Sequence, residues 1–418
     1  MAIIKRIIGR EIIDSRGNPT LEVEIELDNK IRKYASVPSG ASVGIDEATE
    51  LRDCDIERYY GMGVTKAIDI LNNVINPTII GRSFHSVKEL DHLIIDIDGT
   101  KNKSKVGANT TLALSLAFAK CLAASENIAL HKLVSQEYEN EWKVQLGDVK
   151  SPTPMLNVIN GGKHANNGLV FQEFMIVPTI DDSIQEKIRL SCEFFMDLKD
   201  TMEVSGFSTS VGDEGGFAPM ISSTYDALDL LMKVLERSKY RDNFKIAIDA
   251  AASTFYNVKK KNYKFLKDEP PMTREEMVNV YIELIDQYPI MSIEDAMSEE
   301  DIEGWQMITK ELGKEVMLIG DDLFVTNTKK LQYGIDNNLA NAILIKPNQI
   351  GTITETISAV NMARSNGYDV IVSHRSGETE DTSLSHIAVG VRASYIKAGA
   401  PSRSERVAKY NELIRIFS

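Results

Sequence analysis

The chain has 418 residues, 61 acidic and 47 basic, so its formal net charge is −14. At roughly 150 residues per domain this length predicts two or three domains, although a barrel can use about 250 residues as one. The acidic balance argues against a nucleic-acid-binding surface, which needs a basic footprint, but only weakly against a small anionic substrate, because catalytic sites are local.

The N-terminus, the hydropathy and the cysteines are typical of a cytoplasmic protein. The isoleucine-rich start is interrupted by Lys5, Arg6 and Arg10, so we expect no signal peptide. No stretch reaches about 18 apolar residues, so we expect no membrane span. The 3 cysteines lie far apart, which indicates a reduced protein with neither a disulfide framework nor a Cys-x-x-Cys metal site.

The first third of the chain has strand and helix patterns. Residues 20–27 alternate apolar and acidic side chains, which predicts a strand with one wet face, and residues 31–37 predict a returning strand. Helices are expected over residues 64–76 and 106–124, the second of them buried. The polar stretch 136–149, before two prolines, is the predicted linker.

After this linker, short apolar runs alternate with amphipathic segments. Thr273 and Thr352 each precede a glutamate by three residues, as in capping boxes, and Gly367 stands where a C-cap glycine belongs. Alternation of this kind predicts parallel strands. A closed (β/α) barrel is favoured, because each run ends in a polar residue and barrels place catalysis at those strand ends; an open doubly wound sheet is the alternative. The runs are residues 244–249, 290–294, 316–321, 342–346 and 370–374.

Three carboxylates, Asp249, Glu294 and Asp321, end three successive runs. On barrel strands they would converge, repel one another and raise each other's pKa. A hard divalent cation removes that repulsion, and oxygen ligands favour Mg²⁺ over zinc. The alternative is that one or more of them caps a helix or pairs with a surface lysine.

Lys346 and the segment 374–376 end the next two runs. A lysine beside a dication would have a lowered pKa, which a general base needs; the alternative is an ion pair with one of the carboxylates. His374, Arg375 and Ser376 offer cations and a hydroxyl to an anion, and Arg375 can grip a phosphate or carboxylate with two hydrogen bonds.

Three further segments have polar residues in unusual settings. Residues 211–217 place two acids among three glycines, and Gln172 and Glu173 lie within apolar sequence. The glycine-rich loops 160–164 and 38–44 do not fit a P-loop. Together these features predict an acidic, soluble barrel enzyme with Mg²⁺, a lysine base, a carboxyl acid and an anion clamp. Such a site suits proton abstraction next to a carboxylate.

The chain resembles the enolase family, the phosphopyruvate hydratases, over its whole length. The resemblance implies a small α+β N-terminal domain, residues 1–138, before a modified (β/α)₈ barrel, residues 139–418, whose first strands break the simple alternation. Sites of the enolase superfamily are a known example of a Lys or His base working with Mg²⁺. The resemblance is carried by residues 14–20, 38–42, 212–219, 292–295, 320–323, 346–352, 373–381 and 396–401.

The resemblance also implies an activity and a role for each matching residue. The reaction would be the reversible dehydration of 2-phosphoglycerate to phosphoenolpyruvate, with two Mg²⁺ ions per site, in a homodimer or an octamer. Lys346 would take the C2 proton and Glu214 would help expel the C3 hydroxyl. The other implied residues are Asp249, Glu294 and Asp321 for the first Mg²⁺, Ser42 near the second, Arg375 and Ser376 for the phosphate, Lys397 for the carboxylate, and His164, Gln172, Glu173 and His374 in the pocket.

Four positions depart from the family's usual residues: Val43, Ala296, Tyr395 and Ala398. None of them removes a named catalytic group. They keep two alternatives open, namely a paralogue acting on a phosphonate or another phosphorylated acid, and a non-catalytic binding protein of the same fold.

Overall fold

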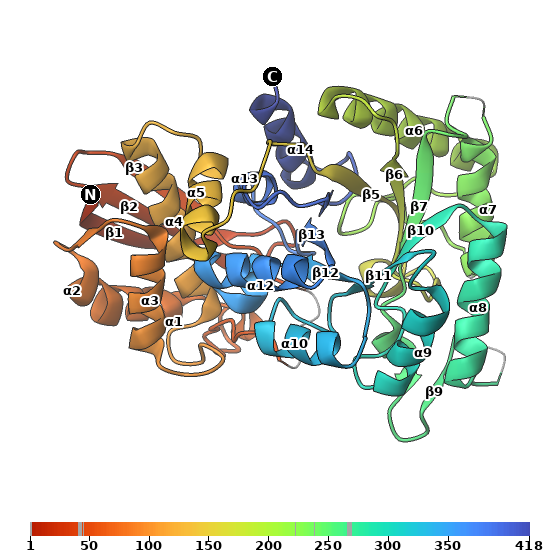
Figure 1. Ribbon diagram of the computed structural model, residues 1–418, viewed down its shortest axis with the longest axis horizontal. Coiled ribbons are helices and arrows are strands. Elements are labelled where there is room, and N and C mark those ends of the chain that lie inside the picture. The colour runs from red at the N-terminus through yellow and green to blue at the C-terminus, as the bar shows by residue number, and fades with distance from the viewer. Residues whose placement is uncertain (1, 41–43, 45, 222, 238, 266–269) are drawn as a thin grey trace.

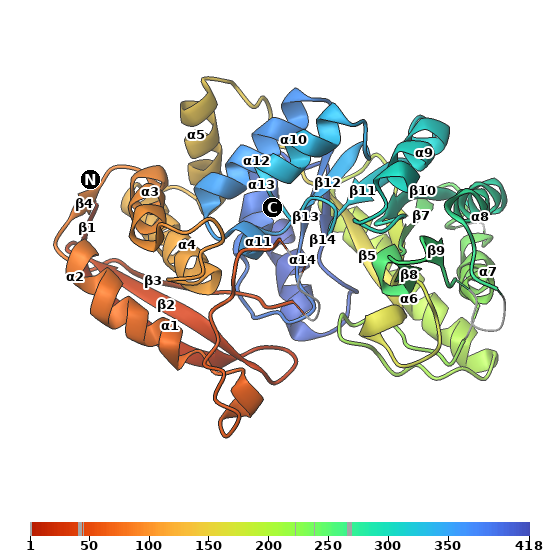
Figure 2. The same cartoon turned by 90° about the horizontal axis from the view of Figure 1, so that it is seen from below.

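The computed structural model describes residues 2–40, 44, 46–221, 223–237, 239–265 and 270–418. A small antiparallel sheet with its helices lies at one end of the molecule, and a closed barrel lies at the other (Figures 1 and 2). The predicted fold class is therefore confirmed, while the division at residues 138 and 139 stays a prediction.

A four-stranded antiparallel sheet in the order β3-β2-β1-β4 forms one layer of the N-terminal domain. The predicted strands over residues 20–27 and 31–37 are confirmed as β2 and β3. The apolar side chains of β2 are buried, whereas Glu22 and Glu24 point to the other face and pair with Arg10 at 3.0 and 2.7 Å. The strands are β1 (Ala2–Ile13), β2 (Pro19–Leu27), β3 (Arg32–Ser36) and β4 (Ser83–Phe84).

Helix α4 is the predicted buried helix, and it packs on β2 and β3 as well as on α3 and α5. Within the described ranges, no single helix is long and apolar enough to cross a membrane; α4 and α5 meet that test only as a pair, bent by 102°. The predicted helix over 64–76 is confirmed, with a π-helical turn inside it. These elements are η1 (Tyr59–Gly61), α1 (Thr65–Ile70), η2 (Leu71–Ile75), α2 (Asn76–Ile79), α3 (Val87–Asp98), α4 (Ala108–Ser125) and α5 (Leu130–Trp142).

The predicted linker over residues 136–149 is wrong in its first half, because α5 continues to Trp142. Contacts with neighbouring helices hold this polar segment helical. The Tyr138 side chain is buried and its hydroxyl bonds Asn361 Oδ1 at 3.3 Å, and the Glu137 carboxylate accepts the Val87 N–H at 2.9 Å. Tertiary contacts override the low apolar content here.

The barrel closes in the order β10-β11-β12-β13-β14-β5-β6-β7, so the open-sheet alternative is excluded. All five predicted runs are barrel strands. Strand β6 is antiparallel to both neighbours, which is the expected break in the simple alternation. The strands are β5 (Thr153–Asn160), β6 (Glu173–Pro178), β7 (Phe244–Asp249), β10 (Ile290–Glu294), β11 (Met317–Gly320), β12 (Ala342–Ile345), β13 (Asp369–Ser373) and β14 (Tyr395–Lys397).

Helices surround the barrel, and two of the predicted helix signals are confirmed. Thr273 and Glu276 form a complete capping box, and Gly367 takes a φ of 77° just after α12. Thr352 caps α12, but the Glu355 carboxylate binds Lys103 Nζ at 2.8 Å and the Thr352 hydroxyl, so that box is only half confirmed. The helices and short elements are η3 (Gly162–His164), α6 (Ile184–Val204), α7 (Thr224–Leu235), η4 (Ala252–Phe255), β8 (Tyr256–Asn257), β9 (Asn262–Tyr263), α8 (Arg274–Gln287), α9 (Ile302–Leu312), α10 (Thr328–Asp336), α11 (Pro347–Ile350), α12 (Ile353–Ser365), α13 (Ser383–Gly390) and α14 (Ser404–Ile416).

The N-terminal domain caps the first turn of α12, the barrel helix that follows Lys346 and α11. Asp91 Oδ2 accepts the Thr354 N–H at 2.9 Å and its hydroxyl at 2.7 Å. Ser115 Oγ accepts the Ile353 N–H at 3.0 Å. These bonds satisfy donors that a helix start leaves unpaired, so the small domain helps to hold the first turn of α12, which follows Lys346 and α11 in the chain.

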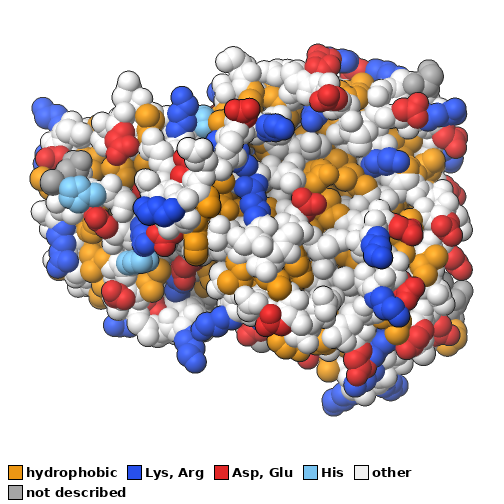
Figure 3. Space-filling model, in the orientation of Figure 1, with side chains coloured by type: hydrophobic (Ala, Val, Ile, Leu, Met, Phe, Trp, Pro, Cys, Tyr) orange, Lys and Arg blue, Asp and Glu red, His pale blue; other side chains and the backbone are white. Residues whose placement is uncertain are grey.

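The face seen in Figure 3 has acidic and basic side chains interspersed over both domains. They are not gathered into one basic stripe on that face. On this face the charges are therefore mixed, while the concentrated charges described next line a cavity at the barrel.

Candidate active site

The carboxyl ends of the barrel strands bring the predicted residues together. Asp249 is paired in register with Glu294 on one side and with Glu173 on the other, and Ser373 is paired with Lys397. Ser42 lies outside the described residues. Glu294 is not among the residues that line the cavity, but it contacts Lys397, which is. The predicted residues that line the cavity are His164, Gln172, Glu173, Glu214, Asp249, Asp321, Lys346, His374, Arg375, Ser376 and Lys397.

Two ammonium groups, that of the buried Lys397 and that of the part-buried Lys346, contact the carboxylates. Lys397 Nζ lies 2.7 Å from Glu294 Oε2, 3.4 Å from Asp249 Oδ2 and 2.9 Å from Glu173 Oε2. Lys346 Nζ contacts Asp321 Oδ2. Of the three predicted metal ligands, Asp249 and Glu294 share Lys397 as a partner, whereas Asp321 is paired with Lys346, which is the ion pair considered as the alternative for that lysine.

The pKa shifts agree with the prediction at Glu294 but differ at Lys346 and at Asp321, where Lys346 and Lys397 outweigh burial and lower the pKa of the carboxyl group. Burial, together with Asp249 and Asp321, raises the pKa of Glu294 to about 8, as mutual repulsion predicts. Burial works to lower the pKa of Lys346, but the surrounding carboxylates, Asp321 foremost and then Glu294, together outweigh it and the pKa is raised. The expected lowered pKa of Lys346 is thus wrong for the side chains alone, because their charge beside the lysine is negative.

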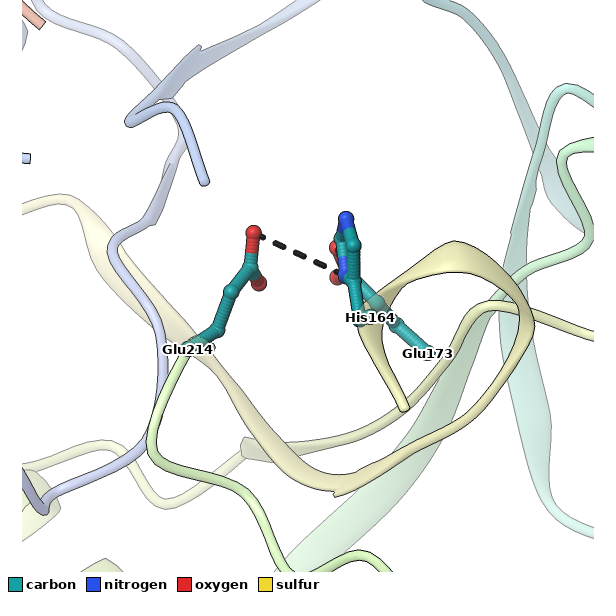
Figure 4. A group of neighbouring side chains, drawn as sticks. All are labelled: His164, Glu173 and Glu214. Carbon is teal, nitrogen blue, oxygen red and sulfur yellow. Dashed lines mark ion pairs between the residues drawn. The ribbon is translucent and has the colours of Figure 1, made fainter. Parts of the chain in front are cut away.

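A second cluster joins the glycine-rich acidic loop to β6. His164 Nδ1 lies 3.4 Å from Glu173 Oε1 and 3.7 Å from Glu214 Oε1 (Figure 4). Glycine is required in this loop, since a Cβ at Gly212 would lie 2.8 Å from the His164 carbonyl oxygen. The close packing of this loop allows Glu214 to line the cavity, as the pattern of acids among glycines predicts.

The predicted anion clamp is bound to an acid that sequence reasoning missed. Arg375 donates from Nη1 to Glu47 Oε2 at 2.9 Å and from Nη2 to Glu47 Oε1 at 3.1 Å. Nη1 also bonds Asn348 Oδ1 at 3.1 Å. Glu47 lies in the N-terminal domain, so this buried pair joins the two domains at the mouth of the cavity.

Asp295 and Asp322 are two further acids that the sequence argument did not assign. Both Asp295 oxygens accept backbone N–H groups, from Asp321 and Asp322, each at 2.9 Å. Asp295 thereby fixes the turn that presents Asp321. Oxygens of the three acids lie within 4.8 Å of one another. The adjacent-acid pairs at 294–295 and 321–322 were the available signal.

Three of the four departures from the family pattern can be located. Ala296 and Ala398 are fully buried, and Tyr395 packs against the barrel interior. None of these three is among the residues that line the cavity. Val43 lies outside the described residues.

The donor set fits a hard divalent cation. Acidic side chains outnumber basic ones along the cavity wall, and carboxylate oxygens are the ligands that Mg²⁺ prefers. An anionic substrate needs positive charge to offset this wall, which a cation on Asp249, Glu294 and Asp321 would provide. The charged residues lining the cavity are Glu47, Glu173, Glu214, Asp249, Asp295, Asp321 and Asp322 against Lys163, Lys346, Arg375 and Lys397.

Comparison with known proteins covers both domains. Residues 4–134 match the family model described as "Enolase, N-terminal domain", and residues 148–418 match "Enolase, C-terminal TIM barrel domain". A protein named enolase from Ehrlichia chaffeensis is 51% identical over 99% of this chain and 96% of its own length. Enolases from Ehrlichia canis and Ehrlichia ruminantium are each 50% identical over the same shares. The chain therefore belongs to the enolase family, whose enzymatic activity is that of a phosphopyruvate hydratase.

Proposed function

We propose that this cavity dehydrates 2-phosphoglycerate reversibly to phosphoenolpyruvate, with Lys346 as the base and Glu214 as the acid. The observation that supports this most directly is that one cavity is lined by Lys346 and Glu214 and by the basic side chains of Arg375 and Lys397. Lys346 takes the C2 proton, and Glu214 supplies a proton to the departing C3 hydroxyl. A lysine and a carboxyl group contributed by different loops can work on adjacent carbons of one substrate.

The remaining residues bind and orient the substrate. Arg375 and Ser376 hold the phosphate, and Lys397 holds the carboxylate. His164, Gln172, Glu173 and His374 complete the wall of the pocket. The Arg375 and Lys397 side chains are buried. Their interactions with an anion are therefore stronger, because the local dielectric constant is low.

Asp249, Glu294 and Asp321 would hold a first Mg²⁺, and Ser42 would lie near a second. When bound, the cations stabilise the negative charge that develops on the substrate carboxylate as the C2 proton leaves. A cation on Asp321 would also offset the charge that raises the pKa of Lys346.

The similarity to enolases and the three free cysteines support the proposal that this protein is cytoplasmic. We expect a homo-oligomer, either a dimer or an octamer, with a small phosphorylated acid as its partner.

One assay tests the assigned reaction. We expect the purified chain to form phosphoenolpyruvate from 2-phosphoglycerate when Mg²⁺ is supplied, measured by ultraviolet absorbance, and to lose this activity with chelator. A folded chain that binds Mg²⁺ but does not turn over 2-phosphoglycerate would support the paralogue. Failure to bind Mg²⁺ would support the non-catalytic protein.

The assignment of Arg375 to the phosphate predicts two separate effects of its substitution, one on KM and one on the free energy of unfolding. Arg375→Met should raise KM about 10- to 100-fold, as expected for loss of hydrogen bonds to a charged group. It should also lower the free energy of unfolding by about 3–5 kcal/mol, because Glu47 is left buried without its charge partner. KM from initial rates and urea unfolding measure the two effects.

The double variant Glu47→Gln/Arg375→Met separates the two causes. It removes both charges, so we expect much of the stability to return while KM stays high. A double variant with the KM of the unaltered chain would mean that Arg375 does not hold the phosphate.

A further inference from the structure

Arg406 is a fully buried cation of α14 that the proposed reaction does not use. Its guanidinium bonds both the segment 374–376 and the loop that carries Glu214. Nη1 lies 2.6 Å from His374 Nδ1 and donates to the Arg375 carbonyl oxygen at 2.6 Å. Nη2 donates to the carbonyl oxygens of Ser376 at 2.6 Å and Asp213 at 3.1 Å.

The contact with His374 decides where the imidazole carries its proton. A guanidinium has only donors, so His374 Nδ1 must accept and cannot hold a hydrogen. The single ring proton then lies on Nε2, the nitrogen that is 3.2 Å from Glu214 Oε2. An imidazolium would place two hydrogens between Nδ1 and Arg406 and is disfavoured. In agreement, burial and the Arg406 charge lower the pKa of His374 to about 4, despite the nearby Glu214 carboxylate.

The position of this proton also distinguishes the two oxygens of Glu214. Oε2 accepts the Asn157 Nδ2–H at 3.0 Å and lies 3.2 Å from His374 Nε2, although the two atoms are not aligned as a hydrogen bond. A proton on Oε2 would compete with the Asn157 donor and lie close to the Nε2–H. Oε1 faces His164 Nδ1 at 3.7 Å and is the oxygen left open to a proton, although His374 and His164 outweigh burial and hold the pKa of this carboxyl group well below its usual range.

We propose that Arg406 is a positioning residue that locks His374 in the Nε2–H form, so that Glu214 delivers its proton from Oε1. This rests on the proposed role of Glu214 as the acid. Without Arg406 the ring is free to take the other tautomer, turn a lone pair toward Oε2 and draw the Glu214 proton to the wrong oxygen.

Neutron crystallography of the unaltered protein in deuterated buffer near pH 7 tests the tautomer without any reference to turnover. We expect deuterium on His374 Nε2 and none on Nδ1. Deuterium on Nδ1, alone or on both nitrogens, would overturn the proposal even if the chain dehydrates 2-phosphoglycerate. If the chain shows the expected tautomer but does not dehydrate 2-phosphoglycerate, the Arg406–His374 assignment stands and the proposed reaction is rejected.

Kinetics of Arg406→Gln test the consequence, because an amide both donates and accepts and no longer imposes one tautomer. We expect kcat for dehydration to fall on the order of 10- to 100-fold, within the range of acid–base catalysis, with KM changed less than about threefold. Exchange of the substrate C2 proton with solvent should persist, since Lys346 is untouched. Arg406→Lys, which keeps a donor-only cation, should recover most of the lost kcat.

Lys409→Gln is the matched control. Lys409 is another buried cation of α14 and bonds the Thr379 carbonyl oxygen, but it does not contact His374. We expect this variant to keep the tautomer. Equal kcat losses in Arg406→Gln and Lys409→Gln, or parallel loss of C2 exchange and dehydration in Arg406→Gln, would contradict the positioning role. If Arg406→Gln does not fold, the neutron result alone decides.

Discussion

Lys346→Met is expected to reduce kcat by about 10²- to 10⁴-fold, because a positioned general base contributes a factor of this size. Methionine keeps much of the volume of lysine and removes only the amine that we assign to the C2 proton. The variant should therefore lose exchange of the C2 proton with deuterated solvent together with phosphoenolpyruvate formation. Proton NMR of 2-phosphoglycerate in D₂O with enzyme and Mg²⁺ measures the exchange directly.

Two companions make this experiment specific to the base. Glu214→Gln should stop dehydration but keep C2 exchange, because the acid acts at C3. Lys409→Met removes another buried lysine, one that is paired with Glu378 at 2.8 Å, and should keep both reactions within about tenfold. If Lys346→Met retains C2 exchange, then another group is the base.

The strand-end carboxylates were predictable because a barrel converts a sequence pattern into a position. Each apolar run that ends in an acid becomes a strand, and parallel register then places Asp249 beside Glu294. The role of the glycine-rich loop was predictable for a similar reason, because the packing around Gly212 leaves no room for a side chain. In both cases the sequence signal lies within a few residues of the functional group, although the segment it packs against is distant in the sequence.

The groups that tune the site were not predictable in the same way. Glu47 meets Arg375, and Arg406 meets His374, only after the chain has folded, and no local spacing marks either pair. The raised pKa of Lys346 has the same origin, because it depends on the Asp321 contact. The helical half of the predicted linker was missed because Tyr138 is stabilised by contacts with distant segments.

Glu294→Gln is expected to weaken Mg²⁺ binding on the order of 100-fold or more, since loss of groups that merely support metal ligands already costs 10- to 100-fold. The substitution preserves shape and removes one charge. Lys397 keeps Glu173 at 2.9 Å and Asp249 at 3.4 Å as partners, so the fold should survive. Isothermal titration calorimetry with MgCl₂ alone measures the affinity, without any need for turnover.

Glu378→Gln is the matched control, because Glu378 is also a buried glutamate beside a buried lysine, Lys409. Its loss removes the same charge from the same barrel mouth, but it is not among the predicted ligands, so Mg²⁺ affinity should change little. Equal affinities in Glu294→Gln and the unaltered chain would mean that the cation binds elsewhere, and the group Asp295, Asp321 and Asp322 would then be the first place to look. A loss confined to Glu294→Gln would support Glu294 as a ligand of the cation.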